Sequence, residues 1–330
     1  MLILKIIISC IIIVVILLIK SIIKLSVNKK IVKREMDSMV IDRMPNVGMI
    51  KSLTVLPLVD YYAVDDSYGT EAGVSYYITA GDINILLDVG ANYGKKHPSL
   101  LLKNMETAGK KIQDIDFIYL SHIHLDHVGG MKDQRGKTFS LSGGFVEMPQ
   151  IPVYSPEDVS PSDLNPGPVP EVITDPRKLK DGIISIGAIP RALYLMGYTM
   201  EQSLAFNVEG KGIVVVIGCG HQSIERIIER VDQLFDAPLY GIIGGLHLPA
   251  GGGRVKVGPL DIQSIVGTDR PPWNGINIKD VEAAVLAIKS ADPSFIALSP
   301  HDSSDLVINR FQTEFGDKYH ELKVGLPLTI

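Results

Sequence analysis

The segment SHIHLDHVGG, residues 121–130, constrains the fold more than any other part of the chain. It places three of the chain's eight histidines and an aspartate within six consecutive positions. Neighbouring imidazoles repel one another when protonated and are costly to bury without partners, so a domain without a ligand gains nothing from such a cluster. Imidazole and carboxylate are ligands that suit zinc, iron or manganese. The segment therefore predicts a site for one metal ion or a pair.

The spacing within the cluster divides the ligands into two groups. The preceding residues, DFIYLSH, have the pattern of a buried strand that delivers the cluster at its end. In an extended chain, residues two apart share a face, so His122 and His124 can bind one metal. Asp126 and His127, past the turn, then face a second metal.

Three further histidines, His221, His247 and His301, each follow a predicted strand. At strand ends the backbone leaves the sheet, and side chains from several strands can converge on one edge. Predicted helices at 98–109, 222–235, 279–291 and 304–316 alternate with the strands, which indicates layered α/β packing. The proline- and glycine-rich stretch 131–192 is predicted to be loop around a cleft.

The N-terminus predicts a membrane segment. Residues 1–25 are almost wholly apolar if Lys5, Lys20 and Lys24 extend their amines toward the headgroups, and about twenty such residues span a bilayer. A cleaved signal would have positive charge first, a shorter apolar core and a small-residue exit site, so an uncleaved single-pass anchor fits better. We expect an anchor at 1–25, a tether at 26–50 and the folded domain at 51–330.

Charge bears on sidedness and partners. Lysine and arginine are concentrated after the apolar run, which by the positive-inside rule predicts that the domain lies on the cytoplasmic side. The anchor implies contact with membrane lipid. Lys+Arg 32 against Asp+Glu 37 gives a formal charge of -5, so the chain lacks the basic footprint of a nucleic-acid binder, and no nucleic-acid partner is expected.

The segment HIHLDH resembles the HxHxDH signature of the metallo-β-lactamase superfamily, and ILLDVG, which contains Asp88, resembles its upstream Asp-Gly motif. Within that superfamily, EAGVSYYI, GCGHQSI, GIIGGLHL and SPHDSS resemble the branch related to dihydropterin phosphate synthase. The resemblance covers residues 51–330. It implies an αββα sandwich, preceded here by the transmembrane helix, and metal-dependent hydrolysis.

The resemblance also implies roles for single residues. His122, His124 and His221 would bind the first metal, and Asp126, His127 and His301 the second. Asp126 and His247 are expected to be catalytic, with His247 a further ligand or an acid near the leaving group. Asp88 would orient a ligand imidazole. The superfamily's bridging aspartate has no clear counterpart in this chain, and Cys219 is near where it would lie. Cys219 is expected to be either a thiol beside the metal ligands or a buried small residue.

The predicted function is that of a membrane-anchored hydrolase in which two divalent cations, zinc favoured over iron or manganese, activate a water toward a carbonyl or phosphoryl centre. The substrate is expected to be a small molecule, and Arg254, Lys256 and Arg270 could hold an anionic one. The alternative is a metal-holding binding or scaffold protein that has lost turnover. A redox di-iron protein would need glutamate in place of His124.

Two loops are predicted to form the substrate wall. Residues 249–278 follow His247 directly and contain the chain's single tryptophan, Trp273, beside Pro271 and Pro272. The proline-rich 149–170 segment would form the rest. The alternative is that the first loop is a solvated excursion and that Trp273 packs on its own domain.

Overall fold

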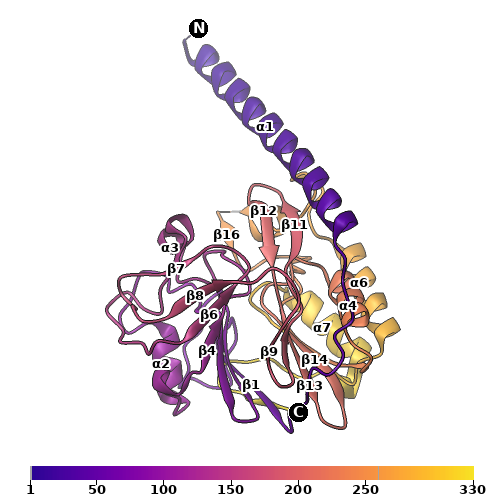
Figure 1. The fold of residues 1–330 in the computed structure, drawn as a ribbon. Coiled ribbons are helices and arrows are strands. Elements are labelled where there is room, and N and C mark those ends of the chain that lie inside the picture. Colours follow the sequence, from indigo (N-terminus) through magenta and orange to yellow (C-terminus); the bar gives the residue numbers. More distant parts are fainter. Residues whose placement is uncertain (1, 259) are drawn as a thin grey trace.

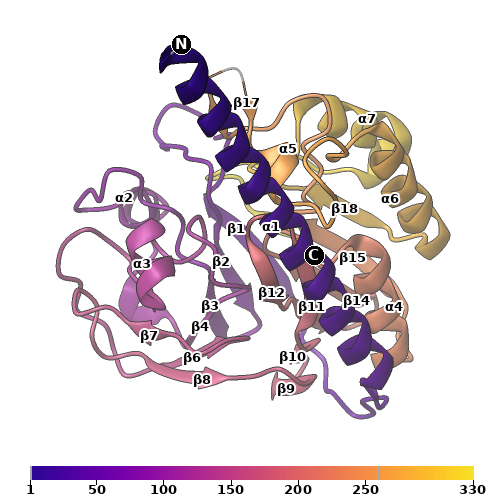
Figure 2. The ribbon, with the colours of Figure 1, turned by 90° about the horizontal axis from the view of Figure 1, so that it is seen from above.

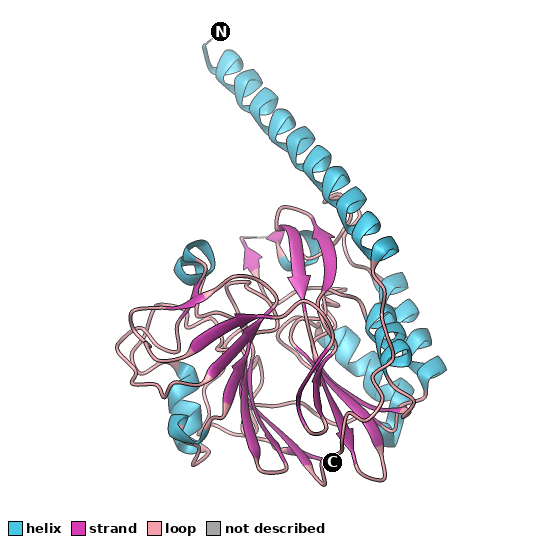
Figure 3. Ribbon diagram, in the orientation of Figure 1, coloured by secondary structure: helices cyan, strands magenta, loops and turns pink. Residues whose placement is uncertain are grey.

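The computed structural model describes residues 2–258 and 260–330. Two β-sheets face each other, and helices cover the outer side of each sheet (Figures 1 and 3). The predicted αββα sandwich is therefore confirmed. A long helix at the N-terminus runs out of the sandwich.

The first sheet contains seven strands in the order β19-β1-β2-β3-β4-β6-β8. Strands β1 to β3 form an antiparallel meander, whereas β3, β4, β6 and β8 run parallel. Because parallel neighbours end at the same edge, the loops after β3 and β4 lie together. The strands are β1 Leu53–Val59, β2 Ser75–Ala80, β3 Ile83–Leu87, β4 Phe117–Tyr119, β6 Pro152–Ser155, β8 Val169–Val172 and β19 Leu328–Thr329.

The second sheet contains six strands in the order β18-β15-β14-β13-β10-β9. The strands β14, β15 and β18 are parallel, so the loops that follow them also share an edge. The strands are β9 Arg177–Lys180, β10 Ile183–Ser185, β13 Leu204–Val208, β14 Gly212–Ile217, β15 Leu239–Gly244 and β18 Phe295–Leu298.

Three hydrophobic layers hold the sandwich together. The central layer joins the inner faces of the sheets, with Tyr76 and Phe206 among its fully buried members. One outer layer packs the first sheet against α2, and the other packs the second sheet against α4, α6 and α7. The helices of the domain are α2 Leu100–Thr107, α3 Met131–Gly136, α4 Ile224–Leu234, α5 Gln263–Val266, α6 Ile278–Ala291 and α7 Asp305–Phe315.

The predicted helices are present because each has an apolar face and an end signal. In α4, the residues Ile224, Ile227 and Val231 recur at helical spacing and are buried. Helix α6 begins at a capping box in which the Asn277 and Asp280 side chains bond to backbone N–H groups.

The stretch 131–192 has more regular structure than predicted. It contributes β6, β8, β9 and β10 to the sheets, and it begins the β11–β12 hairpin that stands beside the N-terminal helix (Figure 2). Short strands flanked by proline and glycine do not produce a long periodic pattern in the sequence. The remaining strands are β5 Thr138–Phe139, β7 Ser160–Pro161, β11 Ile189–Leu193, β12 Gly197–Glu201, β16 Lys256–Val257 and β17 Leu260–Asp261.

The N-terminal helix α1, Leu2–Ser38, is one element of 37 residues. Its apolar first half is not covered by the domain and could span a membrane. Its second half lies against the hairpin, where Leu25 and Val32 pack on Ala192 and Tyr194. The segment 26–50, expected as a weakly patterned tether, is thus half helix, and the rest follows the second sheet to Ile50, which bridges to Val208. Burial of Leu25, Asn28 and Val32 on one face stabilises the helix beyond the membrane-like run.

Candidate metal centre

Five strand ends build one cluster of polar side chains. Asp88 follows β3, and the 121–127 segment follows β4, which together form the first wall. The second wall comes from the loops after β14, β15 and β18, which carry Cys219, His221, His247 and His301. The two walls meet closely, because a Cβ placed on Gly218 would lie 2.2 Å from Ser121 Oγ.

A buried carboxylate organises the first wall. Asp88 accepts hydrogen bonds from the N–H and the hydroxyl of Ser121, both at 2.7 Å. Its Oδ2 also lies 2.7 Å from His127 Nδ1. This contact leaves His127 Nε2 free to face the centre of the cluster. The predicted role of Asp88, orienting an imidazole, therefore has a geometric basis.

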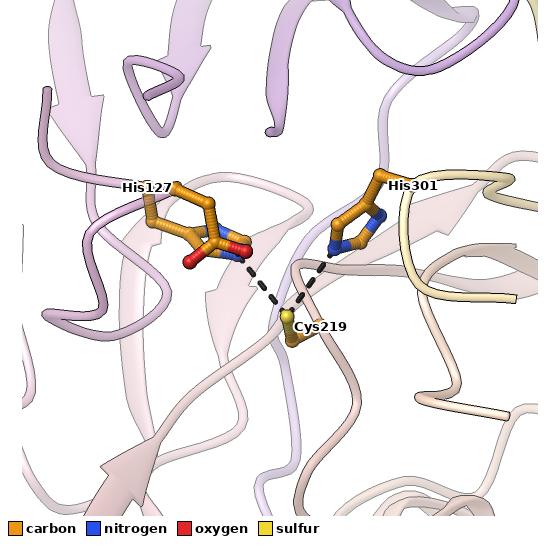
Figure 4. A group of neighbouring side chains, drawn as sticks. His127, Cys219 and His301 are labelled. Carbon is orange, nitrogen blue, oxygen red and sulfur yellow. Dashed lines mark hydrogen bonds and ion pairs between the residues drawn. The ribbon is translucent and has the colours of Figure 1, made fainter. Parts of the chain in front are cut away.

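Cys219 occupies the centre of the cluster. Its Sγ lies 3.2 Å from His127 Nε2 and 3.2 Å from His301 Nε2, so one thiol contacts a histidine from each wall (Figure 4). His301 is held from behind, since its Nδ1 lies 2.7 Å from Ser299 Oγ, which donates to Asp60 at 2.6 Å. The second wall thus has its own orienting carboxylate, which acts through a hydroxyl.

The remaining histidines of the motif face His221. His124 Nδ1 lies 3.2 Å from His221 Nε2, and the ring centroids of His122 and His124 are 4.3 Å apart. His122 Nε2 and His221 Nδ1 are buried and have no hydrogen-bond partner among the described residues. Buried polar atoms without partners are costly, which makes them candidates for ligation.

His247 lies at the floor of a cavity of about 250 Å³. Its ring centroid is 4.4 Å from that of His221, and neither of its ring nitrogens has a partner among the described residues. A Cβ at Gly267 would lie 1.6 Å from His247 Nε2, so only glycine permits the α5 loop to cover this imidazole. Asp302 Oδ2 accepts the backbone N–H of His247 at 2.8 Å.

Burial keeps most of the imidazoles neutral in the absence of a cation. It is the largest cause that lowers the pKa of five histidines: well below the usual value in His122, His221 and His301, to about 3 in His124, and to about 4 in His247. His127 differs, because although burial alone would lower its pKa, the charges of Asp88 and Asp126 raise it to about 9. Neutral imidazoles with free lone pairs are what a divalent cation requires.

The surroundings shift the pKa of two other groups toward their uncharged forms. Burial, together with the carboxylates of Asp126 and Asp302, raises the pKa of the Cys219 thiol well above its usual value. Burial raises the pKa of Glu201 to about 7, although its Oε1 accepts the N–H groups of Cys219 at 3.0 Å and Gly220 at 2.7 Å. A bound cation reverses this preference, because it favours a deprotonated thiol.

Three groups of side chains have ligand atoms that all lie within 4.8 Å of one another. They are Asp126, His127, Cys219 and His301; His122, Cys219 and His221; and Cys219, His247 and Asp302. The first contains the residues expected around the second metal. The next contains two of the three expected around the first, with Cys219 in place of His124, whose Nδ1 is turned toward His221. These donor sets fit a divalent metal.

The predicted substrate wall is only partly where the sequence indicated. The loop after His247 lines the cavity through Gly267, Thr268, Asp269 and Arg270, but Trp273 is 72% exposed and is not among the lining residues. The 149–170 segment does not line this cavity either.

The three candidate anion-binding residues do not all line this cavity. Arg254 is engaged elsewhere, since it lies over the Tyr61 ring at 4.4 Å and donates to Asp305 at 2.7 Å. Lys256 is exposed and does not line the cavity. Arg270 lines the cavity and pairs with Asp280 at 2.8 Å.

Several residues of the cluster escaped the sequence reasoning. None of them belongs to a local sequence motif, and only the arrangement of the strands places them at the site: Glu201, Asp60, Ser299 and Arg191. The single available signal was the position of Ser299, two residues before His301 at the same strand end.

Comparisons with known proteins bear on the family and the fold of this chain. The model of the metallo-beta-lactamase superfamily matches residues 68–138, which include Asp88 and the 122–127 motif. An uncharacterized protein of Methanocaldococcus jannaschii is 26% identical over 198 residues, which cover 53% of this chain and 72% of that protein. From the same organism, 7,8-dihydropterin-6-methyl-4-(beta-D-ribofuranosyl)-aminobenzene-5'-phosphate synthase is 24% identical over 250 residues, 62% of this chain and 80% of that protein.

Among solved structures, Tm1679, a metal-dependent hydrolase of the beta-lactamase superfamily, has a TM-score of 0.57 and 17% identity, covering 84% of this chain and 98% of that one. The structural similarity shows a shared fold. The weak similarity to the dihydropterin protein agrees with the branch resemblance seen in the sequence. The chain thus carries the sequence match of the metallo-beta-lactamase superfamily in residues 68–138, on a domain with the metallo-β-lactamase fold.

Proposed function

We propose that this protein is a metal-dependent hydrolase with a dinuclear site, held at a membrane by α1. The observation that carries the proposal is the position of Cys219, which belongs to both groups of ligand atoms that contain histidines of the motif. A side chain shared by two such groups is suited to bridge two cations. Orphaned nitrogens on His122 and His221 support the same assignment.

In this assignment, His122, His221 and Cys219 would hold one cation, and Asp126, His127, His301 and Cys219 would hold the other. Cys219 then takes the place of the superfamily's bridging aspartate, a closer role than the sequence suggested. His124 completes the first site if its ring turns away from His221, because the two nitrogens now in contact at 3.2 Å would each need a free lone pair.

The cations would supply positive charge that lowers the pKa of a bound water and polarises the substrate oxygen. Zinc fits a set of imidazole, thiolate and carboxylate ligands better than magnesium or calcium, and iron and manganese also accept most of these donors. Hydrolysis consumes one water: its oxygen bonds to the carbonyl carbon or phosphorus, the bond to the leaving group breaks, and the leaving oxygen, or the sulfur of a thioester, takes up a proton.

The chain's own residues supply position and proton contacts. Asp126 is the ligand candidate that is only partly buried, so its carboxylate can also accept a proton from a water that reaches it. Burial lowers the pKa of His247 to about 4, which favours a neutral imidazole at pH 7. His247 therefore suits a ligand or a hydrogen-bond donor to the leaving group better than an imidazolium acid.

Helix α1 supports membrane attachment. The helix is unbroken from Leu2 to Ser38, and its domain-side half packs on the β11–β12 hairpin, where Tyr198 Oη donates to Glu35 at 2.6 Å. An uncovered apolar helix rigidly continuous with a docked one is the arrangement expected of an anchor. The excess of basic residues after the apolar run favours a domain on the cytoplasmic side.

The test is hydrolysis by the full-length protein in detergent, before and after metal removal by a chelator. A panel of phosphodiester, thioester and lactone substrates should reveal turnover that is lost with the metal and restored by zinc, iron or manganese. His301→Ala serves as the inactive reference. Metal bound in stoichiometric amount without turnover on any substrate would favour the alternative, a metal-holding protein without catalysis.

A further inference from the structure

A groove lies between the second half of α1 and the domain, and we call it the α1 groove. Its volume is about 740 Å³, within the range of sites that hold a drug-sized molecule. Part of its lining is apolar, with Ile22, Leu25 and Val32 from α1 and Ala192 from β11. Most of the remaining lining residues are polar or charged.

The groove begins where a bilayer would end. Residues 2–21 of α1 are largely uncovered and apolar, and about twenty helical residues measure about 30 Å, the thickness of a hydrocarbon core. Ile22 is the first residue of α1 that lines the groove. In a bilayer spanned by residues 2–21, the groove would therefore lie at the depth of the lipid headgroups, and its apolar residues Ile22 and Leu25 follow the spanning residues along α1. Figure 1 shows that this helix runs from the domain outward without a break.

The charges that line the groove are mostly positive. Five cationic side chains face two carboxylates: Lys29, Lys30, Lys33, Arg191 and Arg226 against Asp37 and Asp269. Lys33 pairs with Asp37 at 2.7 Å, and Arg191 and Lys29 share Asp269 at 3.5 Å and 3.8 Å. An excess of positive charge remains, which complements an anionic head group.

The groove adjoins the metal centre. Arg191 and Asp269 line both the α1 groove and the cavity that contains His221 and His247. That cavity, about 250 Å³, is smaller than the sites of about 300 Å³ and more that enclose small ligands. A substrate with its reacting bond at the histidines would extend past Arg191 into the groove.

We propose that the substrate is an anionic amphiphile of the membrane, whose head group passes Arg191 to reach the metal centre while its apolar chain follows the α1 groove. The inference rests on the proposed function, since it names the substrate class of the same site. The proposed ligand is a lipid of the bilayer that holds α1, because a water-soluble phosphate would make no contact with the apolar residues that line the groove.

The experiment uses Trp273 as a reporter. This residue is the single tryptophan, is exposed, and lies two positions after Pro271, which lines the groove. Full-length protein is reconstituted in phosphatidylcholine vesicles that contain increasing fractions of brominated phosphatidylglycerol, and quenching of Trp273 fluorescence is measured. Brominated phosphatidylcholine at the same fractions gives the quenching that proximity to the bilayer alone produces.

We expect stronger quenching by the anionic lipid, with half-maximal quenching at a lower fraction. Arg191→Gln should require a roughly fivefold higher fraction, the change expected for one cation near anionic lipid. Lys29→Gln should shift in the same direction and provides a second variant if Arg191→Gln lowers thermal stability. Glycerol 3-phosphate at millimolar concentration should not reverse the quenching.

The matched control is Lys24→Gln, because Lys24 is exposed on α1 closer to the apolar half but does not line the groove. General surface attraction would make its effect at least as large as that of Arg191→Gln, and that result would overturn the proposal. Equal quenching by the two lipids, or full reversal by glycerol 3-phosphate, would also overturn it.

Metal content and hydrolysis of bis(4-nitrophenyl) phosphate are measured on the same samples. Metal-dependent hydrolysis without selective quenching would reject the amphiphile as the substrate but would not contradict the proposed hydrolase function. Selective quenching by a protein that neither binds metal nor turns over would support the groove as a lipid site and reject the hydrolase, and with it the claim that the lipid is a substrate.

Discussion

The two walls of the metal centre are built in different ways. The first wall takes His122, His124, Asp126 and His127 from one turn after a single strand, with Asp88 bonded directly to His127. The second wall takes its ligands from the ends of three parallel strands, and its carboxylate, Asp60, reaches His301 through Ser299. Local geometry fixes the first wall, whereas the second depends on the packing of the sheet.

Cys219 joins the two walls, since its thiol touches an imidazole from each. Substitutions in the two walls should therefore affect metal binding to different degrees. Changes to the first wall should remove metal with little effect on the fold, and changes behind the second wall should weaken binding by smaller amounts.

The largest effect is expected from His122→Ala combined with Asp126→Ala. One residue is removed from each of the two groups that contain motif residues, so both cations should be lost. Elemental analysis should fall from about two equivalents per chain to near zero, by the ligand count that divalent sites require. Circular dichroism should remain that of the parent. A double variant as rich in metal as the parent would disprove the ligand assignment.

Cys219→Ala should have the next largest effect. The variant loses a ligand from both groups but keeps all the histidines and Asp126, so binding should be weakened at both positions without being abolished. Cys219→Asp should restore part of the affinity, because a carboxylate can also bridge. Competition with a chromophoric chelator measures both constants, and wild-type affinity in Cys219→Ala would show that the thiol does not take part.

Asp88→Asn tests the direct support of the first wall. The amide cannot act as the same charged acceptor for His127 Nδ1 and the Ser121 groups, so the imidazole loses its fixed orientation. Loss of such a partner typically lowers metal affinity about 10- to 100-fold. The chelator competition should detect this loss, and an unchanged constant would mean that Asp88 serves the fold alone.

Asp60→Asn is the matched change behind the second wall, and we expect the smallest effect. The Ser299 hydroxyl lies between Asp60 and His301, and it can still contact His301 Nδ1 after the substitution. Metal affinity should fall by less than about tenfold. A loss of metal affinity larger than that of Asp88→Asn would contradict the prediction that the first wall depends more strongly on its carboxylate than the second wall does.

The same contrast explains what the sequence could predict. The 122–127 ligands are adjacent in the chain, so their convergence on one site follows from a strand followed by a turn. His221 and His301 were predicted because each closes a recognisable strand. Apolar patterns in the sequence likewise indicated strands and helices in layers, whereas the αββα sandwich was implied by the family resemblance.

Other features depend on contacts between distant segments. Glu201 meets the N–H of Cys219 only because β12 ends beside the β14 loop, and no spacing in the sequence encodes that approach. The docking of 26–38 on the hairpin is of the same kind, since Val32 needs Ala192 and Tyr194 as partners. Trp273 could not be placed because its orientation follows from the path of a loop.

The most direct test of the shared thiol is anomalous diffraction from crystals of the zinc-loaded protein, recorded above and below the zinc edge. The proposed site predicts two peaks that flank Cys219 Sγ, each at about 2.3 Å from the sulfur. One peak should lie toward His122 and His221 and the other toward His127 and His301. A single peak, or two peaks that both lie beyond bonding distance of Cys219, would contradict the proposed site.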